Sequence, residues 1–306
     1  MTTAAAPRGR SERSESKALI RHAFELARSL GIGKLLVRAD VVEDITVVHG
    51  LRKDEKLVWV TSSHDVARLR IPGDRVIVAP DLRLSRISQI KIGLFVAVVR
   101  RYVDIEESII CLSGTAGSQR IDTLLIANPR RDIPWLRRED VDGKRTAVPS
   151  NVLETVIQVA LRISEGGYEG RPAGTIFVIG ETKDLRPYLR QLILNPLQGH
   201  PAKQRSVYSP DFVDTLRELA ALDGAFIVNT RGTVESAGTY LDAPTRNVRL
   251  RSGLGARHAA AAAITVDTGA MAVAVSETSG SVSVFRKGEL VLELERPEPR
   301  ARRALG

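Results

Sequence analysis

The stretches LDGAFIVNTRG (Leu222 to Gly232) and GLGARHAAAAAITVDTGAMAVAVSETSGSVSVF (Gly253 to Phe285) decide how the C-terminal half of this chain folds. Each combines apolar runs, which predict buried strands or a helix face, with charged residues and glycines at the ends of those runs. Packing alone does not need an acid, a cation and an imidazole at such places. These ends are therefore the first candidates for a functional site.

The segment GLGARH places Arg257 and His258 in the first turn of an alanine-rich helix. The backbone N–H groups and the dipole of a helix favour an anion at that end. Gly253 and Gly255 allow the backbone to approach a ligand closely, and a guanidinium adds bidentate contacts to phosphate oxygens. The pattern indicates a phosphate site, although a glycine-rich turn with a solvated arginine would give the same residues.

Asp223 stands where a helix is expected to give way to a strand. A carboxylate at such an end can hold magnesium or manganese, or polarise a hydroxyl. Ser276 and Glu277 end a further strand shortly before Gly280, where they would supply a hydroxyl and a second carboxylate. Ordinary turns explain each of these residues when it is taken alone. Together with the basic helix start they form a set suited to phosphoryl transfer, provided they meet at one edge of a sheet.

The elements around these ends predict an α/β or α+β domain with a mixed sheet flanked by helices. Helical patterns occupy residues 149–165, 185–196 and 209–222, and apolar runs typical of strands occupy residues 174–180, 223–230, 234–241 and 270–277. Residues 281–294 read as a hairpin that turns at Lys287 and Gly288.

The N-terminal half alternates strands with helical patterns, which predicts a parallel α/β module for regulation or assembly. A helix starting near Ser14 or Ser16 ends at Gly31, and a second covers residues 84–102; strands are expected at residues 34–39, 57–62, 75–80, 108–114 and 123–129. The loop LSGTAGSQ (112–119) could wrap an anion through its N–H groups. It lacks the lysine of a P-loop, so a plain loop is the simpler interpretation.

These patterns divide the chain into four parts. We expect a disordered tail at residues 1–16, an α/β module with its linker at residues 17–148, a second domain at residues 149–295, and a basic tail at residues 296–306. His22, His49 and His64 have no second ligand at metal-binding spacing, and we interpret them as surface or satisfied histidines.

Composition restricts the classes of function. The net charge is +9, from 45 Lys and Arg against 36 Asp and Glu, which suits a polyanionic ligand such as a nucleotide.

The single cysteine, Cys111, rules out an internal disulfide and a cysteine-based metal site, and its apolar surroundings predict a buried thiol. No signal peptide and no apolar run of about 18 residues is present, so we expect a cytoplasmic protein that spans no membrane. Without a helix-turn-helix or zinc pattern, a nucleic-acid partner is not expected.

The combination of DGA (223–225), GxGxRH (253–258) and SExxGxVxVF (276–285) resembles the diadenylate cyclase domain of the DisA N-terminal type. Upstream, GTIFVIG (174–180) and NPLQGH (195–200) resemble that family too. The resemblance covers residues 150–294. The N-terminal half is similar to a pyruvate kinase C-terminal domain, as in the archaeal-type members.

The resemblance implies condensation of two ATP into cyclic di-AMP and two pyrophosphates, with Mn²⁺ or Mg²⁺, in a homodimer or higher homo-oligomer. It gives Asp223 the metal and the 3′-hydroxyl, with Glu277 as a second metal ligand, and it gives Arg257 and His258 the phosphates. Substrate-binding positions would be Gly224, Ala225, Gly253, Leu254, Gly255, Ser276 and Gly280. Because the product is symmetric, two domains should face each other about a two-fold axis.

One position departs from the family pattern. Many bacterial members read RHR, whereas this chain has Ala259 in the third place. Losing such a cation can cost about 2–4 kcal/mol in a transition state, and another arginine such as Arg251 or Arg286 would be a candidate to substitute for it. The alternative function is a catalytically weak or inactive nucleotide sensor on the same fold.

Overall fold

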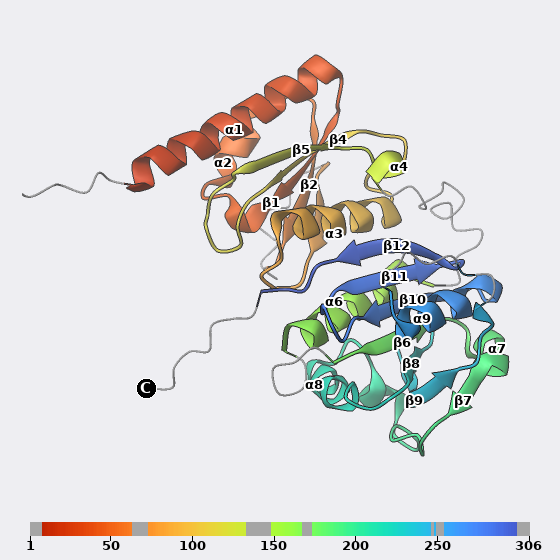
Figure 1. Ribbon diagram of the computed structural model, residues 1–306. Coiled ribbons are helices and arrows are strands. Elements are labelled where there is room, and N and C mark those ends of the chain that lie inside the picture. The colour runs from red at the N-terminus through yellow and green to blue at the C-terminus, as the bar shows by residue number, and fades with distance from the viewer. Residues whose placement is uncertain are drawn as a thin grey trace, which may run out of the picture. The chain divides into compact units, whose positions relative to one another are not determined.

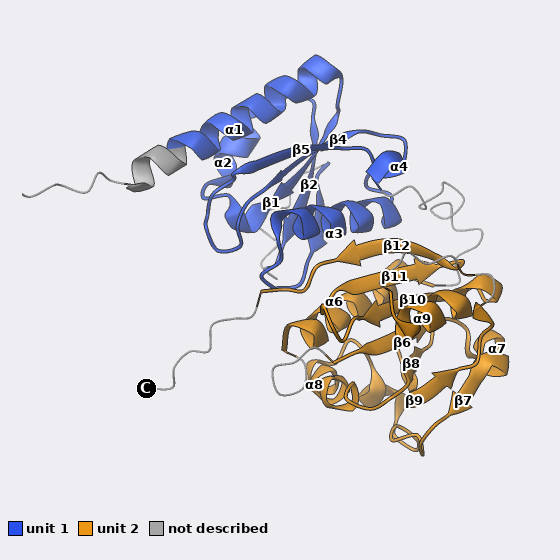
Figure 2. Cartoon of the chain, viewed as in Figure 1, with its two compact units in different colours: residues 1–134 blue, residues 135–306 orange. Residues whose placement is uncertain are grey.

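The computed structural model describes residues 8–62, 73–132, 148–166, 173–245, 248 and 254–298. The chain forms two compact units, residues 1–134 and 135–306 (Figure 2). No helix among the described residues has both the length and the apolar character needed to cross a membrane.

Unit 1 contains a five-stranded sheet in the order β3-β2-β1-β4-β5 (Figure 1). Its elements are α1 (Arg8–Leu30), β1 (Lys34–Arg38), η1 (Ala39–Val41), α2 (Ile45–Leu51), β2 (Lys56–Thr61), β3 (Arg75–Val78), α3 (Arg86–Val99), β4 (Ile109–Ser113), β5 (Thr123–Ala127) and α4 (Pro129–Asp132). All five expected strands are present.

Two expectations for unit 1 were wrong. The sheet is mixed rather than parallel, because β5 runs antiparallel to β4; residues 114–122 connect the two strands directly, and a parallel crossover needs a longer connection with a helix. Residues 8–16, expected to be a disordered tail, belong to α1, which begins at Arg8.

Successive side chains of a strand point to opposite faces of the sheet, so the apolar strands of unit 1 place apolar side chains on both faces. Leu35 and Val37 pack in one cluster with Phe24 and Ala27 of α1. Leu36 points to the other face, where it lies against Gly93 of α3. Cys111 is buried, as the sequence predicted, and burial raises the pKa of its thiol to about 12. His22 is exposed and bonded to Glu25.

Unit 2 contains a seven-stranded mixed sheet in the order β12-β11-β10-β6-β8-β9-β7, in which only β6 and β8 pair in parallel. Its elements are α6 (Ser150–Gly166), β6 (Thr175–Ile179), α7 (Thr182–Leu185), η3 (Arg186–Tyr188), β7 (Leu189–Gln191), η4 (Ala202–Arg205), α8 (Pro210–Leu219), β8 (Ala225–Val228), β9 (Val234–Leu241), α9 (Ala256–Asp267), β10 (Met271–Val275), β11 (Val282–Arg286) and β12 (Glu289–Leu294). The expected hairpin of β11 and β12 is confirmed.

The alanine run of α9 lets this helix lie close to the sheet. Ala261, Ala262 and Ile264 pack against Ile176 and Ala274 in one buried cluster. Small side chains bring the helix axis near the strands, and the start of α9 is thereby held beside the ends of β6 and β10. The sheet and this helix together position the candidate site.

The helix expected at residues 185–196 is wrong. The segment forms a 3₁₀ turn and then the short edge strand β7, which pairs antiparallel with β9. Pro187 lies in that turn. A proline is tolerated in the first turn of a helix, but it has no N–H group with which a helix could continue from the preceding residues.

Candidate active site

The candidate site begins at the N-terminus of α9. Gly255 is its N-cap, and the Gly255 carbonyl accepts hydrogen bonds from the N–H groups of His258 and Ala259 at 3.0 and 3.2 Å. The N–H groups of Ala256 and Arg257, which come before that first bond, have no partner inside the helix and point toward its open end. This end therefore favours an anion, as predicted from GLGARH. Gly253 lies outside the described residues.

Arg257 joins two carboxylates that come from other elements. Its Nη2 lies 3.2 Å from Oδ1 of Asp223, in the turn between α8 and β8, and its Nη1 lies 2.5 Å from Oε2 of Glu277, which follows β10. The Asp223 side chain is 89% exposed and that of Glu277 is 65% exposed, so both are open to a ligand. The acid, the basic helix start and the Ser/Glu turn thus do meet at one edge of the sheet.

The residues after Asp223 have a structural reason to be small. Gly224 has a φ of +108°, and a Cβ there would lie 2.6 Å from backbone atoms of Gly238 and Thr239 in β9. Ala225 is buried in the cluster beneath α9. These two residues fix where Asp223 projects, whereas their proposed contact with substrate stays a prediction.

Gly174 is a site residue that sequence reasoning did not single out. A Cβ at this position would lie 2.7 Å from Cβ of Glu277 and 2.9 Å from Nη1 of Arg257. The bare backbone before β6 therefore leaves room for the ion pair. The signal in the sequence was a glycine at the start of a buried strand, within the segment GTIFVIG that resembles the family.

A pocket of about 630 Å³ opens beside this ion pair. Six of the residues singled out in the sequence line it, namely Leu254, Gly255, Arg257, His258, Ser276 and Glu277, together with residues of β12. Its volume falls in the range usual for small-molecule sites. Asp223 is not among the lining residues, but it contacts Arg257, which is.

Ser276 and Gly280 shape the turn after β10. The Ser276 Oγ accepts a hydrogen bond from the Ser279 N–H at 3.2 Å, and the Gly280 N–H donates to the Ser276 carbonyl at 2.9 Å. Gly280 has a φ of +71° and lies against the side chain of Arg296. Ser276 therefore lines the pocket, whereas Gly280 does not, although its neighbours Ser279 and Ser281 do.

His258 is 5% exposed, although it lines the pocket. Its ring lies edge-on to Phe285, with centroids 6.0 Å apart, and its Nε2 has no hydrogen-bond partner among the residues that the structure describes. Burial lowers the pKa of His258, and the charge of Glu293 opposes that effect in part. The imidazole is accordingly neutral near pH 7.

The structure leaves the third position of the RHR pattern without a cation. Ala259 is not among the residues lining the pocket, and neither is Arg286, which is 8% exposed on β11. Arg251 lies outside the described residues. Among the described residues that line the pocket, Arg257 is the one arginine or lysine.

The donors available to a metal ion are the carboxylates of Asp223 and Glu277. The described residues contain no group of three or more His, Cys, Asp or Glu side chains that would form a complete protein cage. Two exposed carboxylates fit Mg²⁺ or Mn²⁺, since such ions use one or two carboxylates and complete their shell with water and substrate phosphates.

Comparison with known proteins gives concordant matches. The family described as DisA bacterial checkpoint controller nucleotide-binding matches residues 163–290. A diadenylate cyclase of Methanocaldococcus jannaschii is 37% identical over 182 residues, which is 60% of this chain and 57% of that protein. A diadenylate cyclase of Haloferax volcanii is 32% identical over 212 residues, which is 68% of this chain and 75% of that protein.

The chain thus spans little more than half the length of the Methanocaldococcus relative. Among solved structures, a double mutant of DacA from Staphylococcus aureus is 22% identical, covers 49% of this chain and 87% of its own, and has a TM-score of 0.33.

Proposed function

The chain belongs to the diadenylate cyclase family, and we propose on this basis that it condenses two ATP into cyclic di-AMP and two pyrophosphates. The observation that carries the proposal is the Asp223–Arg257–Glu277 ion-pair cluster at the start of α9, beside a pocket of about 630 Å³. It combines acids, a guanidinium and a helix N-terminus around one space, which is what phosphoryl transfer requires.

Each half of the reaction makes one bond and breaks one. A ribose 3′-oxygen bonds to the α-phosphorus of the other ATP, the bond from that phosphorus to its bridging oxygen breaks, and pyrophosphate leaves with that oxygen. We assign the hydroxyl proton to Asp223, whose exposed carboxylate can accept it and pass it to water.

Arg257 can bind phosphate without leaving its carboxylates. A guanidinium has five N–H donors, and the two contacts to Asp223 and Glu277 leave others for phosphate oxygens. The ion pairs then hold the guanidinium in place before the nucleotide arrives, and the first turn of α9 adds backbone donors. Neutral His258 and the Ser276 hydroxyl would add hydrogen bonds from the pocket wall.

Asp223 and Glu277 are the residues that would hold a divalent metal. A bound Mg²⁺ or Mn²⁺ would neutralise phosphate charge and lower the pKa of a coordinated hydroxyl. Arg257 lies between the two carboxylates, so it also limits the repulsion between them before any ion binds.

Two copies of the chain are needed in this proposal. Each ATP supplies a hydroxyl to the other's α-phosphate, and one cluster provides one proton acceptor, Asp223, and one guanidinium. Two clusters facing each other about a two-fold axis would complete both halves at once. The alternative of an inactive nucleotide sensor is not favoured, since both relatives carry the name of the cyclase.

The test is to incubate the purified full chain with ATP and manganese and to detect cyclic di-AMP by mass spectrometry. Asp223→Asn should lower the rate by about 10²-fold or more, because it removes the proton acceptor and a metal ligand. Asp214→Asn, on the exposed side of α8, is the matched control and should keep full activity. ATP binding without product from the unaltered chain would refute the cyclase assignment, and an active Asp223→Asn would remove Asp223 from the chemistry.

A further inference from the structure

The sheet of unit 1 has a topological switch point between β1 and β4. From β1 the chain continues through β2 to β3 on one side, whereas β4 lies on the other side and runs parallel to β1. The segments that follow the carboxyl ends of these two strands therefore diverge. Open α/β sheets characteristically bind ligands in the crevice that such a divergence leaves.

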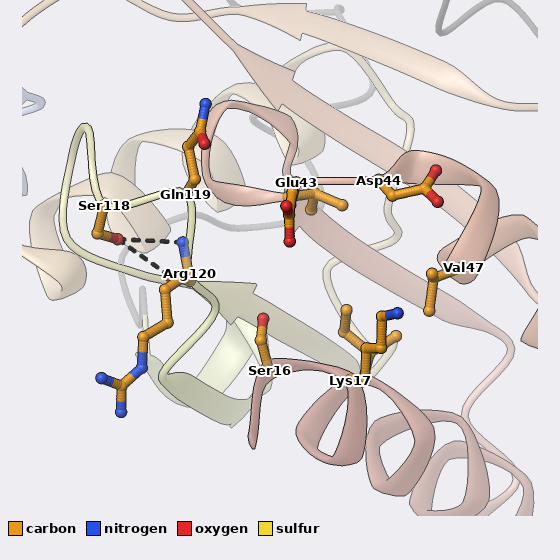
Figure 3. A pocket seen from close by; sticks show the side chains of 10 residues that line it. Ser16, Lys17, Glu43, Asp44, Val47, Ser118, Gln119 and Arg120 are labelled. Carbon is orange, nitrogen blue, oxygen red and sulfur yellow. Dashed lines mark hydrogen bonds between the residues drawn. The ribbon is translucent and has the colours of Figure 1, made fainter. Parts of the chain in front are cut away.

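A pocket of about 130 Å³ lies at this point (Figure 3). Glu43 and Asp44, which follow β1, form one wall, and Ser118 in the loop after β4 forms another. Lys17 of α1 closes the third side, Gln119 and Arg120 extend the wall of Ser118, and apolar Ile20, Val42 and Val47 also line the space. The Arg120 guanidinium is paired with Glu15 at 2.8 Å and extends away from Lys17 in Figure 3. The volume equals that of about four water molecules at roughly 30 Å³ each, which is too small for a nucleotide.

Hydrogen bonds hold these walls in place. The Ser16 Oγ accepts from the Ile121 N–H at 3.0 Å and so ties α1 to the loop after β4. Within that loop the Ser118 hydroxyl bonds both the N–H and the carbonyl of Arg120. On the opposite wall, Asp44 Oδ1 accepts from the N–H and the hydroxyl of Thr46 at 2.9 and 2.6 Å. The pocket is consequently preformed by unit 1 alone.

The pocket presents both signs of charge. In Figure 3 the Lys17 ammonium extends toward the side of Asp44, and the Glu43 carboxylate is turned toward Ser16. Thr46 lowers the pKa of Asp44 by hydrogen bonding and the charge of Lys17 adds to this effect, so this carboxylate is ionised near pH 7. A ligand that fits must offer an anionic group to Lys17, a cationic group to the carboxylates, and an apolar part to Ile20 and its neighbours.

We propose that this pocket binds a small zwitterion of the α-amino acid class. The ligand carboxylate pairs with Lys17, its ammonium with Glu43 and Asp44, and its side chain covers the apolar lining. A ligand with only negative charge would be repelled by the two carboxylates, and a ligand with only positive charge would be repelled by Lys17. The assignment gives unit 1 a ligand of its own, and it does not depend on the cyclase activity of unit 2.

The experiment is saturation-transfer NMR on the full chain, without ATP, with each of the twenty common L-amino acids, followed by calorimetric titration of those that bind. Lys17→Gln and Glu43→Gln should each weaken that binding about tenfold or more, the effect of losing a charge-assisted hydrogen bond. Both side chains are exposed, so the fold should survive both changes. Lys53→Gln, an exposed lysine of the same unit away from the pocket, is the control and should bind as the unaltered chain does.

Inorganic phosphate and succinate serve as anion-only probes in the same measurement. The proposal is overturned if none of the amino acids binds, if only phosphate or succinate binds, or if Lys17→Gln and Lys53→Gln retain equal affinity. Because no nucleotide is present, failure of this test leaves the cyclase assay unaffected, and a failed cyclase assay leaves this test unaffected.

Discussion

At the scale of single residues, His258 differs most from its role as expected from the sequence. The sequence suggested that Arg257 and His258 both bind phosphate by charge. In the structure the Arg257 side chain is partly exposed to solvent, whereas His258 is buried. Burial lowers the pKa of His258, because the charged imidazole loses its water. A division of labour follows: Arg257 supplies charge and His258 supplies a neutral ring against Phe285.

The lowered pKa of His258 has a defined consequence for stability. A group whose pKa is lowered in the folded state takes up its proton more readily in the unfolded state, so stability is lost as pH falls below the unfolded value of about 6.5. We expect the thermal midpoint of the unaltered chain to fall more between pH 7.5 and 5.5 than that of His258→Gln. Scanning calorimetry at both values measures this difference.

His22→Gln is the matched control, since it removes a histidine whose side chain is 70% exposed on α1. If His258→Gln and the unaltered chain lose stability equally on acidification, His258 is not the group that senses the pH.

At the scale of elements, the site depends on three segment ends held by one helix. α9 packs on the sheet through its alanines, which places Arg257 against the backbone before β6 and against the turn after β10. Asp223 reaches the same point because Gly224 adopts a positive φ. The groups of the candidate site are therefore positioned by element ends whose relative places are fixed by the core.

Gly174→Ala tests this arrangement at the end of one element. The new Cβ would lie 2.7 Å from Cβ of Glu277, so the ion pair must shift. Such a displacement of reacting groups can cost about 10²-fold in rate, and we expect that loss in the cyclase assay with little change in the circular dichroism spectrum.

Gly166→Ala is the control, because its Cβ would meet nothing closer than 3.9 Å. Full activity in Gly174→Ala would mean that the Arg257–Glu277 contact is not needed for turnover.

At the scale of the whole molecule, the chain combines two units with separate cores and, in our proposals, separate ligands. Unit 2 carries the cluster for phosphoryl transfer, and unit 1 carries a preformed pocket at its switch point. If the proposed reaction is correct, the symmetry of cyclic di-AMP calls for a second copy of the chain in the working assembly.

Co-expression of the unaltered chain with Asp223→Asn tests whether two copies act together. If both copies of a pair must be intact, random pairing at equal amounts leaves about half of the unaltered chains with an intact partner, so activity per unaltered chain falls to about one half. Differently tagged chains, purified together and assayed for product, measure this fraction. Activity that stays constant at every mixing ratio would show that one copy works alone.

The sequence by itself determined the strands other than β7, the helix carrying Arg257 and His258, and the groups of the candidate site, because local periodicity and residue chemistry record these directly. Asp223, Arg257, Ser276 and Glu277 were all named from patterns that the chain carries locally. It did not determine the edge strand β7, the antiparallel β5 or the role of Gly174, since each depends on a partner distant in the sequence. Only the tertiary structure decided that Arg257 bridges two acids and that His258 is buried, because desolvation and ion pairing arise from packing between elements.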